Sequence, residues 1–320
     1  MVDKVINPIA AFDIDGAHVA PATGDVLDLD VKSGYCWLHL DLNDPELKVW
    51  AKRHLPEIAA RALMQTETRP RCERLADGLI LNLRGVNLNP GSDPEDMVSL
   101  RMWVTRNAVV SGRKRKVWAV DAISQSAAAG IAPATVGRFL AEIIYGLTTR
   151  IETVSIALQD ETDALEEAVL EGRKLPSGQL GNLRQAVIKM RRFVNPQREA
   201  IAALAAMDNW IIAPDELALL RESSNRTRRI VEELDANRDR LAALQEHIDA
   251  DRAHALGRNS YILSVVAAIF LPLGFLTGLF GVNVGGMPGV GSPIAFWLLT
   301  VASLTSGVAL YVIFKYSKWL

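Results

Sequence analysis

The chain ends in two long apolar runs. The runs "YILSVVAAIFLPLGFLTGLF" and "IAFWLLTVASLTSGVALYVIF" occupy residues 261–280 and 294–314, and no charged residue occurs between positions 259 and 314. A helix of about 20 apolar residues is long enough to cross a hydrocarbon core of about 30 Å. The alternative, a buried helical hairpin of a soluble protein, is disfavoured because two such runs in succession are rare outside membranes. The pattern therefore predicts a transmembrane hairpin of two helices.

Basic residues flank this hairpin on one side only. Arg252 and Arg258 precede the first run, Lys315 and Lys318 follow the second, and the segment 281–293 between the runs contains no Lys or Arg. Cytoplasmic flanks carry the excess of basic residues, so we expect both ends of the hairpin in the cytoplasm and segment 281–293 outside. Aromatic residues typical of membrane interfaces stand near the span ends, at Trp297, Tyr311, Tyr316 and Trp319.

Shorter periodicities precede the hairpin. Residues 35–42 alternate between two faces and predict a half-buried strand, and residues 78–89 predict another. Residues 97–120 predict strands broken by turns at Arg106-Asn107 and Ser111-Gly112. The two faces of the first strand are Cys36, Leu38, Leu40 and Leu42 against Trp37, His39 and Asp41.

From about Pro133 the pattern becomes helical. One predicted helix ends near Glu171, and a second runs from about Gln179 to Trp210, where Pro196 could introduce a kink. A third begins at Pro214 and meets no proline or glycine before residue 257, so it continues into the first span. A single helix over 214–280 would be about 100 Å long at 1.5 Å per residue.

These elements predict an α+β cytoplasmic domain with a mixed sheet flanked by helices, a very long stalk helix and a transmembrane hairpin. The predicted divisions are an α/β domain over 1–130, cytoplasmic helices over 131–257 with the stalk from about 214, and the hairpin over 258–320 with its outer loop at 281–293.

The distribution of charged residues also distinguishes the cytoplasmic part from the hairpin. The only charges after residue 257 are Arg258, Lys315 and Lys318, so the preceding residues carry 32 basic against 37 acidic side chains. The first sixteen residues show no basic segment followed by an apolar core, so we expect no cleavable signal peptide and a cytosolic soluble part. Cys36 and Cys72 form no CxxC pattern and predict neither a disulfide framework nor a thiolate zinc site.

Segment 281–293 is rich in glycine and begins with Gly281-Val282-Asn283. A Gly-x-Asn after a span that continues a stalk helix resembles the CorA-type divalent-cation transporters, whose signature is Gly-Met-Asn. Together with "GGMPG" (285–289), "TRPR" (68–71), "LRGVNLNP" (83–90) and "MVSLRMW" (97–103), the chain looks most similar to the ZntB zinc-transporter branch. The resemblance covers essentially the whole length.

The resemblance implies a funnel-shaped homopentamer in the inner membrane, with the first span lining one central pore for divalent cations. Two departures bear on the ion. Val282 replaces the methionine of the signature, and Gly289 stands where magnesium-transporting relatives have a glutamate after Met-Pro. Without that carboxylate the outer loop has less to attract hydrated magnesium, which favours zinc.

Asn283 could serve at the pore entrance. A ring of neutral amides can hydrogen-bond the water shell of a dication without holding it tightly, and weak binding lets the ion leave. The alternative is a helix C-cap, with Gly281 ending the span. Both roles are compatible with one residue.

Counting back from Gly278 in steps of four and three gives a stripe of small or mildly polar residues. We predict that this face lines the pore, with Leu271 as an apolar constriction, while the alternative is a helix–helix seam. The stripe is Gly278, Gly274, Leu271, Ala267, Ser264, Ser260, Gly257, Ala253, Ala250 and Glu246.

One residue around from this stripe lie His247, Asp251 and His254, spaced as neighbours on one helical face. Their ligand types suit zinc, so they are a candidate metal or proton site, against the alternative of a solvated stalk face. His18, His39 and His54 are isolated. The run 113–116, "RKRK", is typical of a solvated strand edge rather than of a nucleic-acid site.

No phosphate-binding GxxxxGK[ST] loop occurs, and neither span contains a carboxylate, His, Lys or Arg. An inside-negative potential of about 100 mV favours inward movement of a dication by about 4.6 kcal/mol, so passive flow would be uptake. The sequence thus predicts a non-enzymatic transporter without cofactor, whose partners are the bilayer, divalent cations and its own copies. The alternatives are a magnesium, cobalt or nickel channel of the same architecture and a non-conducting membrane scaffold or sensor.

Overall fold

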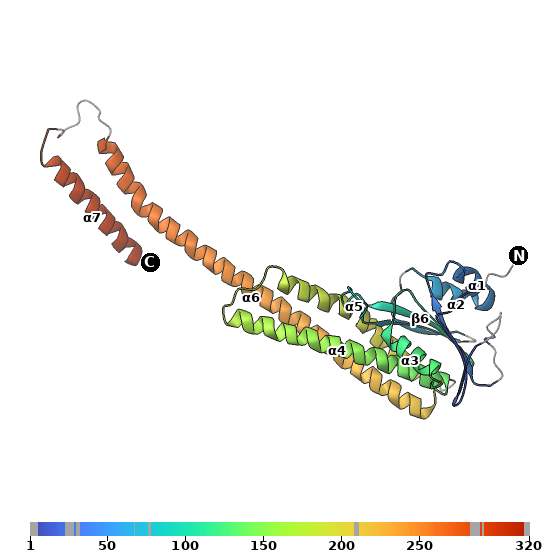
Figure 1. Cartoon of the computed structure of the whole chain (residues 1–320). Helices are drawn as coiled ribbons and strands as arrows, with labels where there is room; N and C mark the ends of the chain where they lie inside the picture. The colour runs from blue at the N-terminus through green and yellow to red at the C-terminus, as the bar shows by residue number, and fades with distance from the viewer. Residues whose placement is uncertain are drawn as a thin grey trace. The chain divides into compact units, whose positions relative to one another are not determined.

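The computed structural model describes residues 6–22, 29, 33–66, 68–75, 78–207, 211–281, 289 and 291–316. The chain divides into two compact units, Met1–Gln245 and Glu246–Leu320 (Figure 1). The strands are β1 Ala10–Asp15, β2 His18–Pro21, β3 Tyr35–Asp41, β4 Arg71–Leu75, β5 Gly78–Gly85, β6 Val98–Val104 and β7 Ala108–Arg113. The helices are α1 Leu47–His54, α2 Glu57–Met64, α3 Trp118–Ala128, α4 Val136–Leu170, α5 Gln179–Ala206, α6 Pro214–Gly281 and α7 Ala295–Tyr316.

In the described part of the first unit, seven strands form one sheet in the order β2-β1-β3-β7-β6-β5-β4. β3 and β7 are parallel, and the other neighbouring pairs are antiparallel. The predicted mixed sheet is therefore confirmed.

Helices cover both faces of this sheet. One face packs on α1 and α2 through Leu38, Leu40 and Ile80. The opposite face packs on α3, α4, α5 and the first turns of α6 through Trp37 and Leu81 (Figure 1). The prediction of a half-buried strand over 35–42 was wrong, because β3 lies inside the sheet and six of its seven residues are buried.

The predicted turn at Ser111-Gly112 was also wrong, whereas the one at Arg106-Asn107 is confirmed between β6 and β7. Gly112 continues β7, in register with Leu40 on β3 and Arg101 on β6. A Cβ atom at this glycine would lie 2.5 Å from Cδ2 of Leu42. The glycine therefore makes room for a core leucine and does not turn the chain.

Beyond β7 the predicted strand pattern over 97–120 fails again, since Trp118 begins helix α3. The three long helices are confirmed, with ends near those predicted from the capping and proline signals. α5 continues through Pro196, and the end predicted at Trp210 lies outside the described residues.

The beginnings of α4 and α6 share one carboxylate. The backbone N–H of Ala213 donates to Oε2 of Glu216 at 2.6 Å, and the hydroxyl of Thr135, the N-cap of α4, donates to Oε1. A negative charge at two helix N-termini complements both dipoles. The contact requires Gly137, where a Cβ atom would lie 2.0 Å from Oε2 of Glu216.

Within the first unit α4, α5 and α6 lie side by side (Figure 1). Ion pairs join α6 to its neighbours, with Arg240 to Asp163 at 2.6 Å as one example. Besides Glu216 and Val231, the buried positions of α6 recur in alternating steps of three and four, the spacing of a coiled-coil seam. They are Leu220, Ser223, Thr227, Ile230, Leu234, Asn237, Leu241 and Leu244.

α6 has 68 residues, about 100 Å at 1.5 Å per residue, and the division between the units falls inside it. The prediction of one helix from Pro214 into the first apolar run is thus confirmed. α6 and α7 are both long and apolar enough to cross a membrane.

Candidate ion-pathway site

In the second unit, α6 packs on α7 through a face different from the predicted pore stripe. Its less exposed positions follow helical spacing and lie on the side of α7. At Gly307 on α7, a Cβ atom would be 3.9 Å from Cδ1 of Leu273 on α6. These positions of α6 are Tyr261, Val265, Ala268, Ile269, Leu273 and Leu276.

The predicted pore stripe is exposed along its whole length in the single chain, from Glu246 to Gly278. Leu271 is 76% exposed. A Cβ atom added at Gly257, Gly274 or Gly278 would meet no atom within 4 Å. Small residues of this stripe therefore form no part of the α6–α7 seam, which leaves them for water, lipid or another copy of the chain.

Three side chains of the stripe contribute oxygen to this face, those of Ser260, Ser264 and Glu246. The hydroxyl of Ser264 donates to the carbonyl of Ser260 at 2.9 Å, which leaves its lone pairs free to accept. Glu246 supplies an exposed carboxylate at the first residue of the unit. The stripe thus combines neutral acceptors, small residues, one large apolar side chain at Leu271 and one charge.

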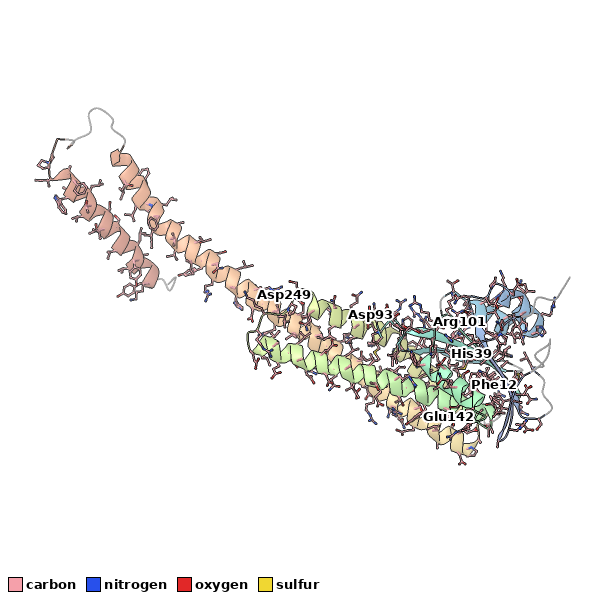
Figure 2. The ribbon with its side chains drawn as sticks, viewed as in Figure 1. Phe12, His39, Asp93, Arg101, Glu142 and Asp249 are labelled. Carbon is pink, nitrogen blue, oxygen red and sulfur yellow. The ribbon has the colours of Figure 1, made fainter. Side chains whose placement is uncertain are left out.

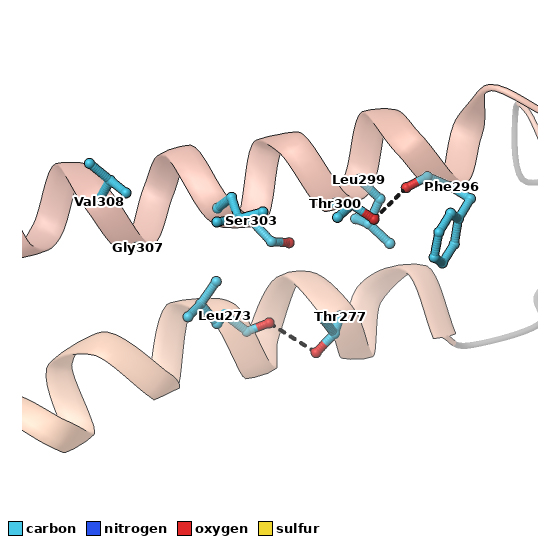
Figure 3. Close-up of a pocket in the computed structure, with 9 residues that line it drawn as sticks. Leu273, Thr277, Phe296, Leu299, Thr300, Ser303, Gly307 and Val308 are labelled. Carbon is cyan, nitrogen blue, oxygen red and sulfur yellow. Dashed lines mark hydrogen bonds between the residues drawn. The ribbon is translucent and has the colours of Figure 1, made fainter.

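The groove between α6 and α7 differs in character (Figure 3). It has a volume of about 530 Å³ and is lined mainly by apolar groups. The hydroxyls of Thr277 and Thr300 donate to the carbonyls of Leu273 and Phe296 in their own helices, at 2.9 and 2.8 Å. Ser303 also lines the groove, and its hydroxyl has no hydrogen-bond partner among the described atoms. With one free hydroxyl and no charged group, the described lining offers little to replace the water shell of an ion.

Of the signature tripeptide, Gly281 is the last residue of α6. Val282 and Asn283 lie outside the described residues, so their roles at the pore entrance stay predictions. The alternative interpretation of Asn283 as a helix C-cap also stays a prediction, because the residues directly after Gly281 lie outside the described part.

His247 and Asp251 lie one helical turn apart, with Nε2 to Oδ2 at 3.6 Å, and are 53% and 69% exposed. His254 is exposed one turn further along α6. Among the described residues of one chain, no group of three or more His, Cys, Asp or Glu side chains gathers closely enough to hold a metal ion. A site here would need ligands from neighbouring copies or from water, and it stays a prediction.

The isolated histidine His39 has a structural role that sequence spacing did not reveal. It is 2% exposed, and its Nδ1 lies 2.8 Å from the hydroxyl of Ser111. Arg113 donates from Nε to Nε2 of His39 at 3.0 Å, which places the imidazole proton on Nδ1. Burial and the nearby guanidinium of Arg113 lower the pKa of His39 to about 3.

Comparison with known proteins supports this architecture. The family model described as "CorA-like Mg2+ transporter protein" matches residues 32–316. The zinc transport protein ZntB of Yersinia enterocolitica is 37% identical over 290 residues, which cover 89% of this chain and 88% of that protein. The divalent cation transporter CmaX of Pseudomonas aeruginosa is 38% identical over 303 residues, covering 92% and 90%.

Solved structures agree with the fold. Full-length CmaX superposes with a TM-score of 0.84 at 32% identity, covering 100% of both chains. The CorA magnesium transporter of Methanocaldococcus jannaschii gives a TM-score of 0.77 over 98% of this chain at 17% identity. Because the sequence identity is low, this match supports the fold alone. With the family match and these full-length relatives, the chain belongs to the CorA family of divalent-cation transporters.

Proposed function

We propose that copies of this chain assemble, most simply as a homopentamer in the inner membrane, around a pore that conducts zinc into the cytoplasm. The observation that carries the proposal is the exposed stripe of α6, which faces away from α7 and includes three glycines with open space around them. Helices that present such a stripe to a common axis would enclose a wide path with room for a hydrated ion.

Two observations support zinc. The ZntB relatives are named zinc transport proteins and cover almost the whole chain. The outer segment 281–293 also contains no carboxylate to attract hydrated magnesium. A magnesium pathway is the second candidate, because the matching family model is described as a Mg2+ transporter.

Charge and potential set the direction in this proposal. The described spans contain no Asp, Glu, His, Lys or Arg, so neither a proton relay nor a tight ion site lies within them. With both chain ends in the cytoplasm, an inside-negative potential of about 100 mV would favour entry of a dication by about 4.6 kcal/mol. Uptake then needs no nucleotide.

Coupling to protons, if transport has it, would involve the face formed by His247, Asp251 and His254. These groups stand on the part of α6 that continues into the first span, and imidazole exchanges protons near neutral pH. Repeated around an axis, the same face would offer a leaving zinc ion imidazole nitrogen and carboxylate oxygen.

The test is uptake of zinc, magnesium, cobalt and nickel into liposomes containing the full chain, with and without an imposed pH gradient. We expect zinc to enter faster than magnesium and its flux to depend on pH between about 5.5 and 7.5, near the reference imidazole pKa. The variant H247Q/H254Q should lose that pH dependence, while H18Q, on the exposed edge strand β2, should retain it. Absence of flux for all four ions would favour a scaffold or sensor, and faster magnesium entry would favour the second candidate.

A further inference from the structure

A pocket between α1 and α2 is not used by the transport mechanism. It has a volume of about 710 Å³, within the range of small-molecule sites. Its apolar part includes Ala51 and Ala60, which are 1% and 5% exposed. The full lining is Lys48, Ala51, Lys52, Glu57, Ala60, Arg61, Met64, Gln65 and Thr66.

Positive charge prevails around this pocket. Lys48 and Lys52 lie one turn apart on α1, and neither is paired with a carboxylate in the described part of the chain. Arg61 and Glu57 are 3.5 Å apart and largely exposed, so their pairing is weak and easily exchanged. Among the described residues that line the pocket, there are thus three cations and one carboxylate beside an apolar surface.

A second observation comes from the sheet beneath α2. Arg71, Asn82 and Arg101 are direct neighbours across β4, β5 and β6, so they point to the same face of the sheet. Arg101 is labelled in Figure 2. It donates to the carbonyl of Leu63 at 2.6 Å and to that of Gln65, a residue of the pocket.

This row holds buried positive charge and an unsatisfied amide. Arg101 is 2% exposed and makes no ion pair in the described part of the chain. Burial and the neighbouring Arg84 lower its pKa, as expected where cations outnumber anions. Asn82 is also 2% exposed, and neither its amide nitrogen nor its oxygen has a hydrogen-bond partner among the described atoms. An anion in the adjoining pocket would compensate part of this positive field.

We propose that the α1–α2 pocket binds a small organic anion. Lys48, Lys52 and Arg61 would hold its phosphate or carboxylate group, and Ala51, Ala60 and Met64 would contact its apolar part. The charge of the head group and the surface for an apolar body together distinguish this ligand from a simple inorganic ion.

Binding is tested on the full chain in detergent by calorimetry and by thermal shift. The probes are AMP, octanoate, inorganic phosphate and uncharged adenosine. We expect AMP or octanoate to bind more tightly than phosphate, adenosine to bind at least tenfold more weakly than AMP, and affinity to fall as salt is raised.

The variant K48Q/K52Q should weaken binding of the organic anion at least tenfold. The matched control K174Q, on the exposed connection between α4 and α5, should bind like the wild type. Equal affinity for phosphate and the organic probes would mean an adventitious ion only and would overturn the proposal. So would unchanged binding in K48Q/K52Q, or no binding of AMP and octanoate at millimolar concentration. Because the readout is binding rather than flux, failure here leaves the transport proposal intact.

Discussion

The side chain of His39 shows how a single buried group can make the fold sensitive to acid. Its hydroxyl partner Ser111 also accepts a hydrogen bond from Nε1 of Trp37 at 3.0 Å and lies 3.3 Å from the carbonyl of Leu38, to which it donates. The network accommodates a neutral imidazole whose Nε2 accepts from Arg113. A second proton on His39 would remove that acceptor and place two cations together in the core.

The sign of the pH dependence follows from this geometry. The folded pKa of about 3 lies below the ordinary value of 6.5, so below pH 6.5 the unfolded state binds the proton first. Stability contributed by neutral His39 is present above pH 6.5 and is lost as the pH falls toward 3, by up to about 1.4 kcal/mol per pH unit. In H39Q, which can keep one donor and one acceptor, we expect the melting temperature to fall less between pH 7 and pH 5 than in the wild type. H18Q, exposed on β2, is the control, and an equal fall in all three proteins would refute the assignment.

Asn283, which follows Gly281 by two residues in the sequence, is the residue with the most specific predicted role. If a ring of Asn283 amides hydrogen-bonds the water shell of the ion, the N283A variant should lose at least nine-tenths of its zinc flux. The loss should be large because the substitution removes the amide from every copy of the chain. Oligomer size, measured by light scattering, should not change. Near-normal zinc flux in N283A would contradict the pore-entrance role and leave a helix cap as the role of Asn283.

At the scale of elements, the coiled-coil seam of α6 contains polar residues. Ser223, Thr227 and Asn237 are buried in the seam, and Nδ2 of Asn237 and the hydroxyl of Ser223 have no partner among the described atoms. Buried polar groups in a seam reduce stability while fixing register. The bundle of α4, α5 and α6 is therefore less stable than an all-apolar seam would make it.

Replacing Asn237 by leucine tests this cost. An unsatisfied buried donor is unfavourable by about 1–3 kcal/mol, so N237L should raise the melting temperature of the full chain in detergent. The neighbouring seam residue Leu234 is fully buried, and L234A should instead lower stability by about 2–5 kcal/mol. A lower melting temperature in N237L would mean that the amide is satisfied by water or by a neighbouring copy.

At the scale of the whole molecule, the membrane orientation rests on the distribution of basic residues, and labelling can measure it. Cysteines placed at Gly285 and Ser317 should react with impermeant reagents from the outside and the inside of the cell, respectively. The native thiols interfere little, because Cys36 is 1% exposed and burial raises the pKa of Cys72 to about 12. Labelling of both new cysteines from one side would overturn the predicted hairpin orientation.

Long-period patterns predicted more of this molecule than short ones. The absence of proline and glycine over 215–256 predicted α6, and uninterrupted apolar runs predicted both spans, because these signals are summed over many residues. The burial of both faces of β3 was not predicted, because it depends on packing against α1 and α2, which the local pattern of the strand does not show. The role of Gly112 was not predicted either, because it depends on contact with Leu42, which is distant in the sequence.

For the candidate site, too, the sequence predicted one part and left another part open. Helical spacing predicted the stripe of α6, and the structure places it on the face opposite α7. The pattern alone could not distinguish a pore from a helix seam, because both require small residues. The surroundings of each glycine separate the stripe from the seam within one chain, while the oligomer axis lies beyond what one chain contains.

The central claim is that this exposed stripe lines the ion pathway, and zinc flux through G274L tests it most directly. A Cβ atom at position 274 would meet no atom of its own chain within 4 Å, and the position is exposed, so leucine should leave the fold intact and narrow a path formed by several copies. With liposomes at an inside-negative potential, we predict that zinc uptake falls at least tenfold in G274L. Uptake should remain within twofold of the wild type in A302L, a matched change on the exposed face of α7. Wild-type flux through an intact G274L oligomer would contradict the account.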